Sequence, residues 1–167
     1  MTLTSRDSAL AIAAIGTATI AMAWGFQLFA GLSPCPLCLQ QRWPYYAAIP
    51  LALLLFLHER RSFTWLRSGL LLIALIMLGG SALALYHAGV EWRWWQGPQS
   101  CAAAAGGLTG GLPDLSNARV IRCDEAPWRF LGLSFAGWNF LVSVFLAGLA
   151  LYGARRAGPQ GSSSVSQ

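Results

Sequence analysis

Charged residues are scarce in this chain of 167 residues. They make up 10% of it, against about 25% in ordinary soluble domains, whereas hydrophobic residues make up 56%. This shortage excludes a soluble globular protein and indicates an integral membrane protein. The net charge of +5 lacks the clustering that is typical of nucleic-acid binding, and we interpret it as a topology signal.

The apolar residues fall into four long stretches, without the period-two alternation of a membrane β-barrel. Each stretch approaches the roughly 20 residues that cross a hydrocarbon core of about 30 Å. We therefore predict an all-α membrane protein, a four-transmembrane-helix bundle that forms a single domain over residues 1–167 and ends in a disordered tail at 158–167. The predicted spans are about 9–30, 37–57, 69–86 and 133–152.

The first stretch has an alternative interpretation as a cleaved signal peptide. Arg6 precedes it, and Ala21 and Ala23 are small residues at the spacing of a cleavage site. The apolar run nevertheless continues to Phe29, which is longer than a usual signal and favours a retained span.

Ionisable side chains are nearly absent from the predicted spans. His58 and His87 fall at span ends, and the polar residues Gln27 and Asn139 are uncharged. Because proton and ion pathways normally require charges within the membrane, this pattern argues against a transporter.

The arginines are distributed unevenly. Both tails and the loop after the second span are rich in arginine, whereas the segment 87–132 balances four arginines against four acidic residues. By the positive-inside rule, both termini face the cytoplasm and 87–132 forms a long outer loop between the third and fourth helices. All four cysteines then lie outside, which in a bacterium is the periplasm, where disulfides persist. The arginines behind this prediction are Arg6, Arg60, Arg61, Arg67, Arg155 and Arg156.

Two closely spaced thiols, Cys35 and Cys38, lie between the first and second apolar stretches. A CxxC pair is therefore placed at a membrane surface. We predict that a helix begins near Pro36, a residue tolerated at the first helical position, and that Cys38 in its first turn has a lowered pKa. Arg42 follows four residues later on the same helix face and would support a Cys38 thiolate. The alternative role for Arg42 is to reach the lipid headgroups.

Other uses of the CxxC pair fit less well. A c-type haem site requires histidine at position 39, which is Leu39, and a structural zinc site usually has two short-spaced ligand pairs. Cys101 and Cys123 are instead separated by twenty-one residues, so we expect no metal. The alternative interpretation is a purely structural disulfide between them, which would stabilise the folded protein by roughly 3 kcal/mol through loop closure. The Gly/Ala-rich loop has a typical reach of roughly 25 Å, so either cysteine could approach the CxxC pair.

Three groups of residues form a specific combination along the chain. They are Pro34-Cys35-Pro36-Leu37-Cys38 followed by Arg42, the distal Cys101, and Cys123-Asp124 followed by Trp128 and by Phe130-Leu131-Gly132-Leu133 at the start of the last span. Together with the four-span layout, this combination resembles the DsbB family of membrane quinone-dependent thiol oxidases over almost the whole chain.

The resemblance implies an inner-membrane enzyme that reoxidises a periplasmic DsbA-like thiol oxidant and passes the electrons to a quinone, either ubiquinone or menaquinone. Its redox disulfides would be Cys35–Cys38 and Cys101–Cys123. Cys101 would form the mixed disulfide with the partner, and Cys123 would pass the exchange on to Cys35. Cys38 would then face the quinone.

Two further residues are implied as quinone-binding. Arg42 would polarise a quinone carbonyl, and His87 matches, less closely, a histidine near the quinone in that family. Two alternatives stay open. One is a membrane oxidoreductase similar to vitamin K epoxide reductase, and the other is a non-enzymatic membrane scaffold stapled by disulfides.

Overall fold

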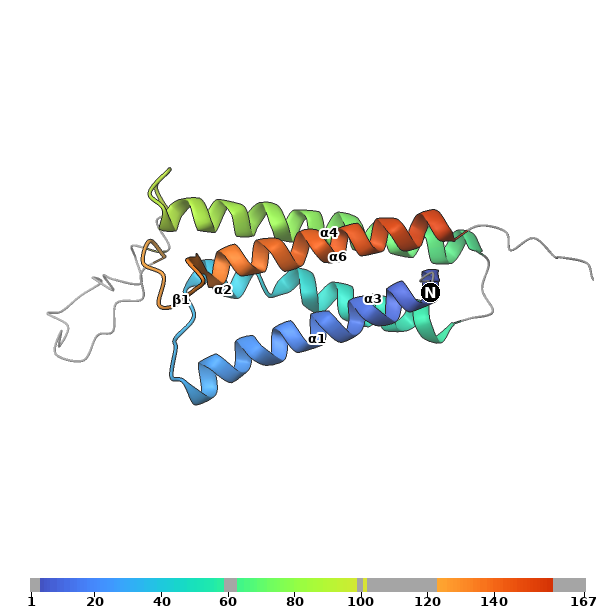
Figure 1. Ribbon diagram of the computed structural model, residues 1–167, viewed down its shortest axis with the longest axis horizontal. Coiled ribbons are helices and arrows are strands. Elements are labelled where there is room, and N and C mark those ends of the chain that lie inside the picture. Colours follow the sequence, from blue (N-terminus) through green and yellow to red (C-terminus); the bar gives the residue numbers. More distant parts are fainter. Residues whose placement is uncertain (1–3, 59–62, 99–100, 102–122, 158–167) are drawn as a thin grey trace, which may run out of the picture.

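The computed structural model describes residues 4–58, 63–98, 101 and 123–157. Within these residues, long helices lie side by side in a bundle (Figure 1). A short helix and a two-stranded antiparallel hairpin lie at one end, and in the hairpin Arg129 pairs with Ser134. The elements are α1 (Ser5–Phe29), α2 (Pro36–Gln40), α3 (Trp43–Leu57), α4 (Phe63–Glu91), β1 (Arg129–Phe130), β2 (Leu133–Ser134) and α6 (Phe135–Arg156).

Three of the helices within the described part of the chain, α1, α4 and α6, are long and apolar enough to cross a membrane. They correspond to the first, third and fourth predicted spans. Helix α4 extends beyond the predicted 69–86 at both ends. The prediction covered only its apolar centre, and the charged residues Arg67 and Glu91 lie outside that centre, toward the two ends of the helix. The predicted tail at 158–167 lies outside the described residues, as does loop segment 102–122.

The second predicted span, 37–57, is not a single helix. It is divided between α2 and α3, and the fifteen residues of α3 rise only about 22 Å. Pro44 lacks an amide hydrogen and cannot donate to the carbonyl of Gln40, so the helix is interrupted at Gln41 and Arg42. A fourth membrane crossing through this segment stays a prediction.

Small side chains let the helices approach closely. The core is rich in alanine, and a side chain added at Gly153 of α6 would lie 2.8 Å from Cβ of Ser8 in α1. Helix α1 itself supplies Ala9, Ile12 and Ala13 to this core, which favours a retained first span over a cleaved signal.

Helix α1 diverges from α6 toward the end of the bundle that carries α2 (Figure 1). The two helices approach each other near Gly153 and Ser8 at the opposite end. This splay leaves room for a cavity beside the CxxC pair.

Candidate active site

The CxxC pair is built into the start of α2. Cys35 is the N-cap of this helix and Pro36 follows at its first turn, as the sequence predicts. The Cys35 sulfur accepts a hydrogen bond from the backbone N–H of Cys38 at 3.2 Å, and the two sulfurs lie 2.9 Å apart. Both cysteines are free thiols, held at a separation from which a disulfide can form.

Cys35, and not Cys38, has the contacts that favour a thiolate. The side-chain hydrogen bond with Cys38, followed by interactions with His87, lowers the pKa of Cys35 to about 5, although burial acts in the opposite direction. Nε2 of His87 lies 3.6 Å from the Cys35 sulfur. The prediction that Cys38 has the lowered pKa is therefore wrong, because the side-chain hydrogen bond between the two cysteines and the contact with His87 favour the thiolate on Cys35.

The lowered pKa predicts an unusual pH profile for alkylation of Cys35 in the reduced protein. An ordinary thiol with a pKa near 8.5 loses about 25-fold in alkylation rate between pH 9 and pH 7, because its thiolate is protonated. The Cys35 rate is expected to stay nearly constant over this range and to fall only as the pH drops through about 5. Iodoacetamide labelling quantified by peptide mass spectrometry measures each cysteine separately. An acid-shifted profile at Cys38 with an ordinary one at Cys35 would restore the original assignment.

A metal at this pair is disfavoured by geometry. The ligand atoms of Cys35, Cys38 and His87 lie within 4.8 Å of one another. Two thiolates that share a tetrahedral zinc at about 2.3 Å would lie about 3.8 Å apart, well beyond the observed 2.9 Å. The arrangement favours bonding between the sulfurs.

The distal cysteines are joined to each other. Cys101 and Cys123 form a disulfide with a Cα–Cα distance of 5.6 Å. Both are buried and share a small apolar cluster with Cys35, Leu37 and Val90. All four cysteines thus gather at one end of the bundle, although most of the loop between Cys101 and Cys123 lies outside the described residues.

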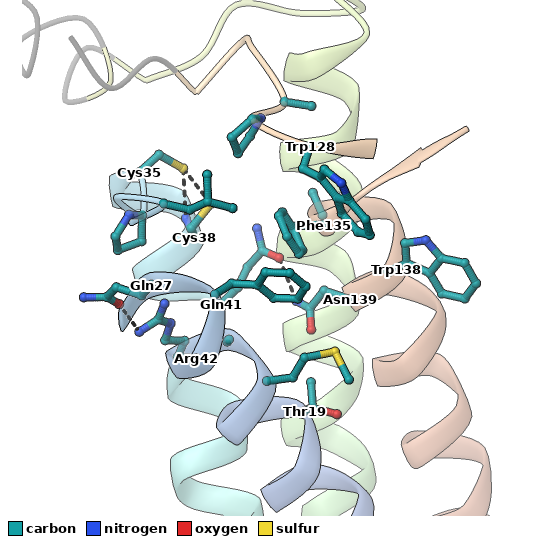
Figure 2. A pocket seen from close by; sticks show the side chains of 18 of the residues that line it. Thr19, Gln27, Cys35, Cys38, Gln41, Arg42, Trp128, Phe135, Trp138 and Asn139 are labelled. Atoms are coloured by element: carbon teal, nitrogen blue, oxygen red, sulfur yellow. Dashed lines mark hydrogen bonds between the residues drawn. The ribbon is translucent and has the colours of Figure 1, made fainter. Parts of the chain in front are cut away.

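A cavity of about 880 Å³ opens beside the CxxC pair (Figure 2). Its walls come from α1, from the α2–α3 segment, from α6 and from residues 125–128, and they are mainly apolar. Phe26, Trp128 and Phe135 form an aromatic cluster in this wall, with ring centroids 5.0 to 5.6 Å apart. The polar side chains that reach the cavity include Gln27, Gln41, Arg42, His87, Glu91 and Asn139.

Arg42 lines this cavity but is held by α1. Its Nη1 donates to Oε1 of Gln27 at 2.9 Å (Figure 2). Its guanidinium lies over the ring of Trp24, at 5.1 Å from the ring centroid. Among the described residues, no hydrogen bond or ion pair joins Arg42 to Cys38. The argument from a shared helix face is wrong, because α2 ends at Gln40 and Gln41 and Arg42 form a turn between α2 and α3.

His87 is buried on α4, beside the CxxC pair. Its Nδ1 lies 2.6 Å from Nε2 of Gln41, and its Nε2 faces both Cys35 and the carboxylate of Glu91, the latter at 3.9 Å. Sequence reasoning named His87 but missed Gln41 and Glu91. A helical spacing of four residues from His87 to Glu91 is the signal that could have drawn attention to Glu91.

Comparison with known proteins agrees with this geometry. A family model described as "Disulfide bond formation protein DsbB" matches residues 5–153. The chain belongs to the DsbB family. It is 34% identical over 143 residues to Disulfide bond formation protein B of Marinobacter nauticus, covering 80% of this chain and 82% of that protein. It is 31% identical over 161 residues to the protein of that name from Azoarcus sp., covering 90% and 94%.

A third relative, Disulfide bond formation protein B of Verminephrobacter eiseniae, is 38% identical over 131 residues, which cover 72% of this chain and 70% of that protein. No solved structure matches the chain. Membership of the DsbB family and the three apolar helices indicate a multi-pass bacterial membrane protein of disulfide bond formation, a thiol–disulfide oxidoreductase.

Proposed function

We propose that this protein is an inner-membrane disulfide oxidase that reoxidises a periplasmic DsbA-like oxidant and passes the electrons to a quinone. The observation that carries the proposal is the packing of a CxxC pair between a second disulfide and an apolar cavity. In this arrangement the CxxC pair can exchange disulfides with the distal pair and can also transfer electrons to an acceptor bound in the apolar cavity. Family membership favours this function over a vitamin K epoxide reductase-like enzyme or a scaffold.

The thiol exchange proceeds through the distal pair. A thiolate of the reduced partner attacks Cys101, forming a mixed disulfide and releasing Cys123 as a thiolate. Cys123 then attacks Cys35 of the oxidised CxxC pair, and Cys38 leaves. When the partner's second thiolate displaces Cys101, the partner gains its disulfide, and Cys101 attacks Cys123 to re-form the distal disulfide and release Cys35. Two electrons have then moved from the partner to the CxxC pair.

The lowered pKa of Cys35 suits the last of these displacements. A thiol with a low pKa leaves a disulfide faster, because its thiolate is more stable. The contacts at the helix cap therefore favour transfer of electrons into the CxxC pair.

The cavity fits a quinone by its size and lining. Ligand pockets usually measure about 300 to 1,000 Å³ and combine apolar walls with a few oriented polar groups. Arg42 and His87 are such groups, and the aromatic cluster offers flat faces to a ring. A bound quinone, ubiquinone or menaquinone, would supply the acceptor of two electrons and two protons for the CxxC pair. Arg42 would orient a carbonyl oxygen with its guanidinium N–H groups.

Turnover of purified protein tests the proposal. Reduced DsbA-like protein and a short-chain quinone are mixed with the enzyme, and quinone absorbance is followed. We expect quinone loss equal to the partner disulfide formed, and none with the Cys38→Ser variant. Partner oxidation that proceeds equally well without quinone would refute the assignment.

We further propose that both termini are cytoplasmic and all four cysteines periplasmic. The first residues of α1 and the end of α6 lie at the opposite end of the bundle from α2, in support of this topology (Figure 1). A membrane-impermeant thiol reagent is therefore expected to label reduced Cys101 and Cys123 in intact spheroplasts. Labelling of these cysteines only after lysis would reverse the orientation.

A further inference from the structure

A row of hydrogen-bonded side chains, the polar chain, runs from the CxxC pair into the bundle. The Ser143 and Tyr45 hydroxyls lie 3.1 Å apart, and the Tyr45 hydroxyl donates to Oδ1 of Asn139 at 2.6 Å. Nδ2 of Asn139 donates to Oε1 of Gln41 at 2.6 Å (Figure 2). The polar chain ends at Nδ1 of His87, and its members are Ser143, Tyr45, Asn139, Gln41 and His87.

Hydrogen-bond chemistry allows the polar chain only two directions. Each amide has one donor end and one acceptor end, and a tyrosine has a single hydrogen, so reversing one link reverses them all. In one direction Gln41 donates to Nδ1 of His87, which leaves the imidazole hydrogen on Nε2. In the other, Nδ1 carries the hydrogen and Nε2 presents a lone pair.

The groups facing Nε2 select the first direction. The Cys35 sulfur lies 3.6 Å from Nε2 and is an acceptor when it is a thiolate, whereas the Glu91 carboxyl oxygen at 3.9 Å is beyond hydrogen-bond distance. A lone pair on Nε2 would oppose the Cys35 thiolate, whereas an N–H can donate to it. The other titratable or charged neighbours are Cys38 beside Cys35 and Arg129, whose charge acts on Glu91.

We propose that the polar chain is a positioning device, which holds His87 with its hydrogen on Nε2 and directs it at the sulfur of Cys35. Ser143, Tyr45 and Asn139 act through Gln41 without touching the reacting sulfurs. A hydrogen bond to the thiolate stabilises it as a leaving group during exchange. The purpose of this device rests on the proposed function, but the tautomer does not.

The tautomer can be observed directly. His58 and His87 are the two histidines of the chain, so a His58→Gln variant leaves one imidazole. His58 is exposed at the end of α3, away from the site. In reduced, ¹⁵N-histidine-labelled protein carrying a histidine-free tag, NMR separates the protonated ring nitrogen from the unprotonated one. We expect Nε2 protonated and Nδ1 unprotonated. Protonation of Nδ1, alone or together with Nε2, would overturn the proposal.

Variants then separate positioning from mere stability. Asn139→Leu is expected to mix the two tautomers and to slow Cys35 alkylation at pH 5 about fivefold, which corresponds to a midpoint that rises from about 5 by one pH unit. Ser81→Ala is the matched control, because Ser81 is also a buried hydroxyl but donates to Leu78 within its own helix. It should leave both readouts unchanged.

Tyr45→Phe removes only the hydroxyl that orients Asn139, and it carries the test if Asn139→Leu does not fold. A wild-type tautomer and alkylation profile in the folded variants would refute the positioning role. Because neither readout requires quinone or partner, a protein that fails the turnover assay yet shows the Nε2 tautomer refutes the proposed function alone.

Discussion

Replacing Cys123 by serine is expected to stop turnover and to leave Cys101 covalently joined to the DsbA-like partner. The distal disulfide cannot form in this variant, so Cys101 is a free thiol that captures the partner's oxidised pair, and no Cys123 thiolate is present to resolve the mixed disulfide. A non-reducing gel of the variant mixed with oxidised partner should show a band at the summed mass. The quinone-dependent rate should fall to background.

Two variants control this result. Cys101→Ser removes the attacking thiol and should trap no partner, although it stops turnover equally. Cys38→Ser leaves Cys35 as a buried thiol that shares an apolar cluster with the distal disulfide. Efficient trapping of the partner through Cys35 in that variant would mean that the partner reaches the CxxC pair directly and that the distal disulfide is structural.

Replacing Arg42 by glutamine is expected to weaken apparent quinone affinity tenfold or more while leaving the pH profile of Cys35 alkylation unchanged. Loss of one charge-assisted hydrogen bond costs about 1.5 to 3 kcal/mol. The Cys35 profile should persist, because its causes are Cys38 and His87 and do not include Arg42. Steady-state turnover at varied quinone concentration and the alkylation profile measure the two effects separately.

Arg42→Lys and Gln27→Leu refine the assignment. Lysine keeps the charge but not the planar fork, so the KM for quinone should still rise. Gln27→Leu removes the acceptor that holds the guanidinium and should raise KM less than Arg42→Gln does. A wild-type KM in Arg42→Gln would reduce Arg42 to a contact between α3 and α1, and the aromatic cluster with His87 would become the quinone site.

Much of this protein follows from local chemistry that can be read along the chain. Apolar stretches of membrane length predicted α1, α4 and α6, because a backbone in lipid must bond within its own segment. The Cys-Pro-Leu-Cys spacing predicted a helix start at Pro36, since proline suits the first turn. Motif order along the chain indicated the DsbB family, which the family model confirms.

The second span shows where sequence reasoning stopped. Apolar content favoured one helix over 37–57, but Pro44 removes a backbone donor and the chain turns at Gln41 and Arg42. That turn decides which side chains meet. It brings Arg42 into contact with Gln27 on α1, 15 positions away in the sequence. It also brings Gln41 into contact with His87 on α4, 46 positions away.

The sequence by itself determined the class of chemistry: membrane helices, two cysteine pairs and a nearby cation. Only the tertiary structure decided which thiol is the more acidic, because that depends on how the two cysteine side chains face each other and on His87, a residue 52 positions away from Cys35 in the sequence. It also decided that Asn139 and Tyr45, two ordinary polar residues of apolar helices, belong to the same hydrogen-bonded row as the active-site histidine. Pairing of such groups across helices depends on packing, which no local pattern records.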